Sequence, residues 1–260
     1  MTRIFHHLAF LLIFQMCTLI CWAQSDPNAS FQEISFHTQD SVLVYGDLHH
    51  LHKDRPVILL FHQAGANGRA EYEEVIPILT EKEFNVLAID QRSGGQRFGG
   101  YNRTVALITN NNYSYCEAYP DLVGALDFLV ESGYTGHKIL WGSSYSAALV
   151  VRLAHAQPDD IAGVLAFSPA SGGPMQACKA DDLFETLEVP LLLMRPAREM
   201  EVESVANQYQ LALQHGHQTF VVENGVHGSS MMVGSRVSDD PAQQWGIVMT
   251  FIERCLKMPK

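Results

Sequence analysis

The sequence predicts an α/β fold with a mostly parallel, eight-stranded sheet and helices on both faces. Short apolar runs alternate along the chain with segments whose apolar residues recur at helical spacing. Several of these runs are apolar throughout, which is typical of strands that are buried on both faces. Repeated strand and helix units of this kind require a sheet that is covered on both sides.

The first third of the chain predicts four strands and one helix. Residues 31–38 and 42–51 alternate apolar and polar side chains, which predicts an antiparallel pair of strands joined by a turn. Residues 56–61 are apolar throughout and predict the first strand that is buried on both faces. A helix over 69–82 and a strand over 85–89 complete the first strand and helix unit.

The rest of the chain continues the alternation. A helix begins at Pro120, because proline is favoured in the first turn and apolar residues then recur at helical spacing. The expected elements that follow are a strand at 139–141 with a helix after it, strands over 161–167 and 191–194, a helix over 202–215, a strand over 219–222 and a closing helix over 242–256.

Two irregular insertions interrupt this pattern, at residues 91–118 and 168–188. Both are longer than ordinary connections between a strand and a helix, so we expect them to serve or cover a site. The 24–260 part of the chain, insertions included, is expected to form a single domain, because its length suits one hydrophobic core.

Residues 1–23 are typical of a secretion signal. Arg3 precedes an apolar core over 8–14, and small residues stand where a signal peptidase cleaves, at Cys21 and Ala23. The mature chain is then expected to begin near Gln24, to be periplasmic or secreted, and to have no membrane contact. The alternative is an uncleaved membrane anchor, but polar residues interrupt the apolar run.

Cysteine use and charge limit the function classes further. Removing the signal leaves Cys116, Cys178 and Cys255, and we expect Cys116 to pair with Cys178 because both lie in the irregular insertions. The alternative is three buried or idle thiols. No spacing of cysteines or histidines indicates a metal site, and no nucleotide-binding motif is present. The formal net charge of −11 argues against a nucleic-acid partner.

The stretch with the most informative chemistry is Gly142-Ser143-Ser144-Tyr145-Ser146. It follows an apolar run and precedes a run of helix-forming residues, as in the Gly-x-Ser-x-Gly turn that exposes a nucleophilic serine between a strand and a helix. Ser146 stands in place of the last glycine but is also small. The alternative is a serine-rich N-cap of an ordinary helix.

Four motifs together resemble the α/β-hydrolases, in particular the compact dienelactone-hydrolase-like and serine-esterase branches. The resemblance spans roughly residues 41–256. The motifs that carry it, in chain order, are Phe61-His62-Gln63-Ala64-Gly65, Asp90-Gln91-Arg92-Ser93-Gly94-Gly95, the serine turn, and Gly225-Val226-His227-Gly228.

The resemblance implies a catalytic triad in the order serine, acid, histidine. Ser144 takes the place of the nucleophile and His227 that of the base. Glu199 takes the place of the acid, although it follows Pro196 where relatives carry a glycine. Glu201 and Glu203 remain alternative acids, and Arg195 or Arg198 could pair with any of the three glutamates as surface charge. His155, His215 and His217 fall in or beside predicted helices, and His62 is expected to be structural.

The resemblance also implies a pair of backbone N–H groups that stabilise the oxyanion of the reaction. Tyr145, the residue after the nucleophile, is one expected donor. The other is expected in the turn after the first buried strand, from Ala64 in preference to Gln63. Asp90 and Arg92, at the end of the next strand, are expected to anchor loops.

The expected function is therefore that of a secreted serine hydrolase that cleaves an ester or related acyl bond of a small to medium substrate, with no cofactor. Two alternatives stay open: a serine peptidase that acts on short peptides, and a hydrolase-fold protein that only binds its ligand. The oligomeric state and the natural substrate do not follow from the sequence.

Overall fold

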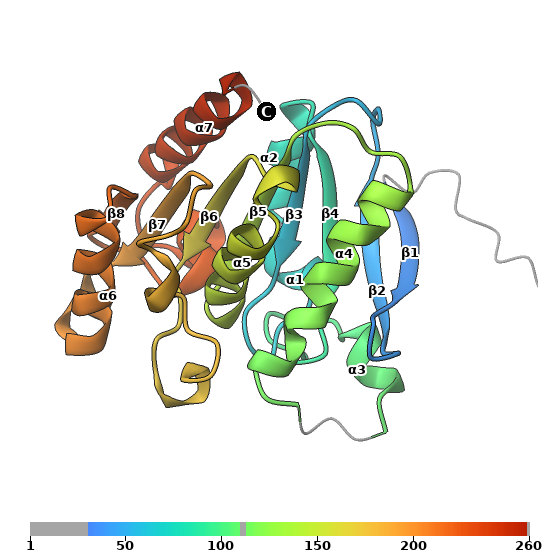
Figure 1. Cartoon of the computed structure of the whole chain (residues 1–260), viewed down its shortest axis with the longest axis horizontal. Helices are drawn as coiled ribbons and strands as arrows, with labels where there is room; N and C mark the ends of the chain where they lie inside the picture. The colour runs from blue at the N-terminus through green and yellow to red at the C-terminus, as the bar shows by residue number, and fades with distance from the viewer. Residues whose placement is uncertain (1–30, 110–112, 259–260) are drawn as a thin grey trace, which may run out of the picture.

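An eight-stranded sheet forms the centre of the computed structural model, which describes residues 31–109 and 113–258 (Figure 1). The strand order is β1-β2-β4-β3-β5-β6-β7-β8; β2 is antiparallel to both β1 and β4, and all other pairs are parallel. The mostly parallel sheet predicted from the sequence is therefore confirmed. The strands are β1 (Gln32–His37), β2 (Leu43–His49), β3 (Val57–Phe61), β4 (Asn85–Asp90), β5 (Lys138–Ser143), β6 (Gly163–Phe167), β7 (Leu191–Pro196) and β8 (Gln218–Val222).

Helices cover both faces of the sheet. Figure 1 shows α4 and α5 in front of the central strands and α1 and α2 behind them. Every residue of β3, β4, β5, β6 and β7 is buried, as the uninterrupted apolar runs predict. The helices are α1 (Gly68–Tyr72), α2 (Val75–Glu81), α3 (Arg103–Leu107), α4 (Tyr119–Glu131), α5 (Tyr145–Ala156), α6 (Glu203–Gln214) and α7 (Ala242–Lys257).

Two hydrophobic clusters, one on each face, hold these layers together. The first joins α4, α5 and α6 to side chains such as Leu59 and Leu140. The second joins α1, α2 and α7 to the neighbouring positions Ile58 and Ile139. Consecutive residues of one strand therefore enter different clusters, because successive side chains point to opposite faces.

The predicted helix over 69–82 is divided in the structure into α1 and α2. Pro77 explains the break: it lacks the N–H that would donate to the Glu73 carbonyl one turn earlier in a continuous helix. A second difference is α3, which lies inside the 91–118 insertion. The Asn102 side chain caps this helix by accepting the Val105 N–H at 2.8 Å.

The two insertions are joined covalently. Cys116 and Cys178 form a disulfide, which confirms the predicted pairing, and Cys255 is a buried free thiol. The disulfide ties the segment before α4 to the excursion between β6 and β7. Tyr115, next to Cys116, stacks on Tyr145 with 5.0 Å between the ring centroids.

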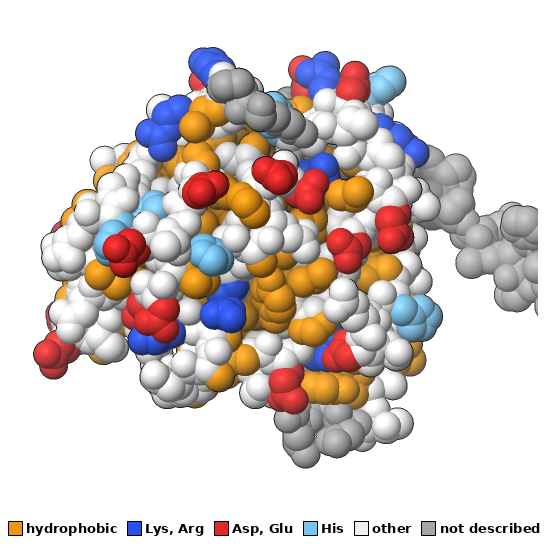
Figure 2. Space-filling view, in the orientation of Figure 1, with side chains coloured by type: hydrophobic (Ala, Val, Ile, Leu, Met, Phe, Trp, Pro, Cys, Tyr) orange, Lys and Arg blue, Asp and Glu red, His pale blue; other side chains and the backbone are white. Residues whose placement is uncertain are grey.

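The surface of the molecule carries charges of both signs, and the helices can be assessed for their ability to span a membrane. On the face shown in Figure 2, acidic and basic side chains are interspersed, and apolar side chains gather in a strip near the centre. Within residues 31–109 and 113–258, no helix combines the length and the apolar character needed to span a bilayer. The predicted signal over 1–23 lies outside the described residues.

Candidate active site

Ser144 lies in a sharp turn between β5 and α5. Its backbone has φ 60° and ψ −117°, a conformation that costs a non-glycine residue energy and that persists only when the surroundings fix it. Here the Ser144 N–H donates to the Phe167 carbonyl at 2.9 Å, and the Ser144 carbonyl accepts the Ala170 N–H at 3.1 Å. Both partners come from β6 and the loop after it, so the neighbouring strand holds the turn in place.

The residues on either side of Ser144 explain the size pattern of the motif. A Cβ on Gly142 would lie only 2.6 Å from the Ser146 carbonyl oxygen, so no larger residue fits there. Ser146 is fully buried; its hydroxyl donates to the His62 carbonyl at 2.6 Å and accepts from Gln91 Nε2 at 2.8 Å. The serine in place of the last glycine therefore ties the turn to the ends of β3 and β4.

The structure brings Ser144, His227 and Glu199 into one hydrogen-bonded chain. His227 Nε2 lies 2.8 Å from Ser144 Oγ, and His227 Nδ1 lies 2.5 Å from Glu199 Oε1. Because the carboxylate can only accept, Nδ1 carries the proton and Nε2 is left to accept the serine hydroxyl. The His227 side chain is 42% exposed, so this chain of groups is open to solvent.

Among the three candidate acids, only Glu199 contacts His227 in the described structure. Its side chain is 16% exposed and also accepts hydrogen bonds from Ser168 Oγ at 3.2 Å and Arg195 Nη1 at 3.0 Å. Glu201 and Glu203 are exposed. Burial raises the pKa of Glu199, but the hydrogen bond and charge of His227, the Arg195 charge and the Ser168 hydroxyl together hold it below its ordinary value.

Gln63 is excluded as an oxyanion donor, which corrects one of the expected assignments. Its backbone N–H donates to Glu71 Oε2 at 2.7 Å, and its side-chain amide lies 3.3 Å from Glu71 Oε1. No acceptor among the described residues takes the Ala64 N–H. Tyr145 is the first residue of α5, where an N–H has no acceptor within the helix. Ala64 and Tyr145 remain the candidate donors.

His62 is structural in this arrangement, as expected. It is fully buried, and its Nε2 accepts the Gln91 N–H at 2.8 Å, so Nδ1 carries the proton and donates to the Gln63 carbonyl at 2.8 Å. Burial lowers the pKa of His62, which keeps the ring neutral. His62 therefore locks the turn after β3 against the turn after β4.

Asp90 and Arg92 anchor loops, also as expected. The Asp90 carboxylate accepts the Gly68 N–H at 2.9 Å and the Arg103 N–H at 3.0 Å, so it holds the starts of α1 and α3. Arg92 is buried and forms an ion pair with Asp121 at 2.7 Å. Neither side chain contacts the serine and histidine pair.

Reasoning from the sequence assigns no role in the site to three residues that lie in it, Glu71, Ser168 and Arg195. The sequence analysis treats Arg195 only as a charge that could pair with a glutamate at the surface, but its side chain is only 2% exposed. Ser168 Oγ accepts the Gly228 N–H at 3.0 Å and donates to Glu199, so it connects the loops of the acid and the histidine. Two of these residues could have been found from their position in the sequence. Ser168 and Arg195 lie at the carboxyl ends of β6 and β7, and binding sites in such sheets form at the carboxyl ends of the strands.

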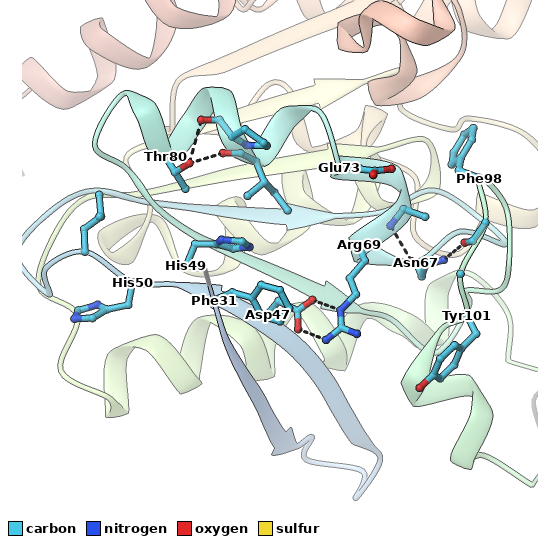
Figure 3. Close-up of a pocket in the computed structure, with 16 residues that line it drawn as sticks. Phe31, Asp47, His49, His50, Asn67, Arg69, Glu73, Thr80, Phe98 and Tyr101 are labelled. Atoms are coloured by element: carbon cyan, nitrogen blue, oxygen red, sulfur yellow. Dashed lines mark hydrogen bonds and ion pairs between the residues drawn. The ribbon is translucent and has the colours of Figure 1, made fainter. Parts of the chain in front are cut away.

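A separate cavity of about 740 Å³ lies between β2, α1, α2 and residues 98–101. Figure 3 shows that Arg69 points across it toward Asp47, with which it forms an ion pair at 2.6 Å. The described lining of this cavity includes none of Ser144, Glu199 and His227, so it lies apart from the hydrogen-bonded chain described above. No group of three or more metal-binding side chains occurs in the described part of the chain.

Comparison with known proteins identifies the fold. No protein-family model and no curated protein sequence matches the chain. A solved carboxyl esterase from Bacillus coagulans is similar with a TM-score of 0.66 at 12% identity, over 88% of this chain and 99% of the other. A dienelactone hydrolase from Anabaena variabilis is similar with a TM-score of 0.63 at 16% identity, over 87% and 99%.

A third structure extends the comparison to a larger protein. An acylaminoacyl peptidase from Pyrococcus horikoshii is similar with a TM-score of 0.60 at 14% identity, over 90% of this chain but 43% of the other. At identities this low, the likeness of all three concerns the fold. The chain has the α/β-hydrolase fold expected from its motifs.

Proposed function

We propose that this chain, which has the α/β-hydrolase fold, is a serine hydrolase that cleaves an ester or related acyl bond of a small to medium substrate. The observation that supports this most directly is the hydrogen-bonded chain from Ser144 Oγ through His227 to Glu199. Solved structures with this fold and similar dimensions include proteins described as esterases and dienelactone hydrolases, which agrees with the proposal.

The geometry supports acyl transfer to water in two steps. His227 Nε2 takes the hydroxyl proton as Ser144 Oγ attacks the carbonyl carbon, and then gives that proton to the leaving alcohol. A water molecule, activated by the same nitrogen, releases the acyl group from the serine. Glu199 holds the Nδ1–H tautomer of His227 and stabilises the imidazolium that forms during each step.

The developing oxyanion would be stabilised by the backbone N–H groups of Ala64 and Tyr145. Removing one donor of this kind costs enzymes roughly 3 kcal/mol of transition-state stabilisation. The Tyr145 N–H also lies at the start of α5, where the aligned peptide dipoles favour negative charge. The buried Glu71 carboxylate fixes the adjoining turn through the Gln63 N–H.

The proposal is tested by treating the chain with a fluorophosphonate and measuring its intact mass, because such reagents label an activated serine whatever the natural substrate is. We expect one adduct, which peptide mapping places on Ser144. Ser144→Ala should abolish it. Ser143→Ala is the matched control, because the Ser143 hydroxyl is fully buried and accepts the Ser229 N–H at 2.9 Å. A folded parent that takes no label would favour a protein that only binds its ligand.

A second candidate function is hydrolysis of short peptides. The likeness of this chain to part of an acylaminoacyl peptidase supports it, because the same triad chemistry cleaves amides. Matched ester and anilide substrates with the same acyl group separate the two. If the anilide is cleaved at a comparable kcat/KM, the peptidase assignment is favoured; if only the ester is cleaved, the esterase assignment stands.

We also propose that the chain is exported to the periplasm or beyond. The Cys116–Cys178 disulfide supports this, because such bonds persist in oxidising compartments and are rare in the cytosol. The predicted signal over 1–23 gives the route.

A further inference from the structure

Arg195, in β7, contacts the acid of the proposed triad through the carboxylate oxygen that His227 does not contact. Its Nη1 donates to Glu199 Oε2 at 3.0 Å, whereas the other carboxylate oxygen, Oε1, faces His227 Nδ1 at 2.5 Å. The arginine side chain is 2% exposed. A guanidinium buried this deeply is costly to keep unless it is paired and hydrogen-bonded.

The guanidinium is itself held by a second layer of contacts. Its Nη2 donates to the Pro169 carbonyl and to Gln208 Oε1, and Gln208 Nε2 donates to Asp181 Oδ1 at 2.5 Å. Gln208 belongs to α6 and is 1% exposed. The contacts therefore run from the 168–188 excursion through α6 and β7 to the acid.

We propose that Arg195 is a positioning residue for the reaction: held by Gln208 and Pro169, it fixes the orientation of the Glu199 carboxylate and keeps it charged, so that Oε1 stays on His227 Nδ1. This inference rests on the proposed function, because Arg195 acts only through the acid. The acid loop needs such a fixture, since Glu199 lies in the short 3-10 turn Ala197–Glu201, outside the sheet.

The charges around the acid agree with this role. The groups that face Glu199 are His227, Arg195 and the neutral Ser168 hydroxyl, and Asp181 is the other carboxylate that acts on the Arg195 charge. Burial lowers the pKa of Arg195, but a guanidinium stays protonated under any condition in which the protein is folded. The two oxygens of the Glu199 carboxylate have different partners: Oε1 contacts His227 and Ser168, and Oε2 contacts Arg195. A rotation of the carboxylate would therefore break hydrogen bonds at both oxygens.

A purely structural role for Arg195 makes a different prediction. If the arginine only tied the 168–188 excursion to α6, its removal would affect the reaction equally whether or not the acid is intact. A double-mutant cycle distinguishes the two roles, because residues that act through one another are not additive.

The experiment measures the maximal rate of Ser144 labelling by a fluorophosphonate in the parent, Arg195→Met, Glu199→Gln and the double variant. Arg195→Met should slow labelling about a hundredfold, the size of effect that a small misplacement of a catalytic group causes. Glu199→Gln should slow it about a thousandfold or more. In the Glu199→Gln background, the further effect of Arg195→Met should fall to about twofold.

Three additional measurements make the outcome decisive. Gln208→Leu, which removes one support of the guanidinium, should give a smaller loss of the same kind and serves if Arg195→Met does not fold. Arg195→Lys should restore part of the rate, because it returns the charge without the planar fork. Arg103→Met is the matched control: it removes a buried arginine that pairs with Asp90, and it should lower stability without coupling to Glu199.

The hydrogen bond itself gives a readout that is independent of reactivity. The His227 Nδ1 proton should give a far-downfield proton resonance in the parent that is lost or shifted in Arg195→Met. Equal labelling rates in the parent and Arg195→Met, or additive effects of Arg195→Met and Glu199→Gln, would overturn the positioning role and leave the proposed function intact. A parent that is not labelled at all would overturn the proposed function and this role with it.

Discussion

The hydroxyl group of Ser146 stabilises the turn that contains Ser144. Ser146 occupies the place where the motif has its last glycine, and its hydroxyl is one of the groups that connect the turn to the loops after β3 and β4. A glycine would allow the same backbone approach but would leave the His62 carbonyl and Gln91 Nε2 without this partner. The departure from the motif therefore adds hydrogen bonds to the turn.

We predict that Ser146→Ala lowers the free energy of unfolding by about 2 kcal/mol, because it leaves buried polar groups without a partner. Urea denaturation checks the value. Ser144→Ala is the matched control in the same turn and should change the unfolding midpoint little, since the Ser144 hydroxyl lies at the partly exposed site. Equal stability of Ser146→Ala and the parent would contradict the proposed role of the hydroxyl.

The lowered pKa of Glu199 leads to a prediction of how the free energy of unfolding depends on pH. Its pKa is below the ordinary 4.5 in the folded chain, so the carboxylate adds stability above that pH, and this contribution is lost as the pH falls through the folded-state value. The difference in unfolding free energy between the parent and Glu199→Gln should therefore be largest near neutral pH and shrink in acid. Denaturation curves across this range test it, with Glu201→Gln as the control, because Glu201 is an exposed glutamate of the same turn.

At the scale of the elements, the Cys116–Cys178 disulfide links the two insertions, 91–118 and 168–188, to each other. The disulfide joins two residues that are 62 positions apart in the sequence. It also places Tyr115 against Tyr145, directly after the nucleophile. The irregular segments that flank the proposed site are thus restrained by a covalent bond as well as by packing.

We predict that replacing Cys116 and Cys178 together by alanine lowers the free energy of unfolding by up to about 4 kcal/mol, the loop-closure value for this separation. A reductant should destabilise the parent and leave the double variant unchanged. Thiol titration of the denatured, unreduced chain lacking residues 1–23 should find one thiol, Cys255. Three thiols would show that the disulfide does not form.

At the scale of the whole molecule, the topology brings the proposed site together. Ser144, Glu199 and His227 follow β5, β7 and β8, and parallel strands of one sheet end at the same edge. The separation of the groups along the chain is therefore unrelated to their distance in space, and one sheet edge supplies the nucleophile, the acid and the base.

Export is the prediction that concerns the chain as a whole. Protein recovered from its native host should begin near Gln24, and Edman degradation or intact mass measures this directly. An unprocessed chain retained in a membrane fraction would instead favour the uncleaved anchor. A control in which Ala23 is replaced by a bulky residue should block cleavage, because signal peptidases require a small side chain there.

Much of the fold could be predicted because it depends on local patterns. The first two strands follow from alternating apolar and polar residues and the other six from apolar runs. The residues of the proposed triad follow from the order of short motifs at strand ends. The break between α1 and α2 could also have been found, since Pro77 is visible in the sequence. The short α3 was missed because five residues give too little periodicity to detect.

The sequence by itself determined the order of the eight strands and the place of Ser144 in a strand-to-helix turn, because each depends on residue type and local spacing. It left the pairing of Cys116 with Cys178 as one of two alternatives, and the structure has the disulfide. Only the tertiary structure shows that Glu199 is the candidate glutamate in contact with His227, that the Gln63 N–H donates to Glu71, and that Arg195 is buried against Glu199. These outcomes depend on which side chains from distant segments meet at one sheet edge. The hydrogen-bond partners and the burial of a side chain depend on these tertiary contacts, so no local sequence pattern encodes them.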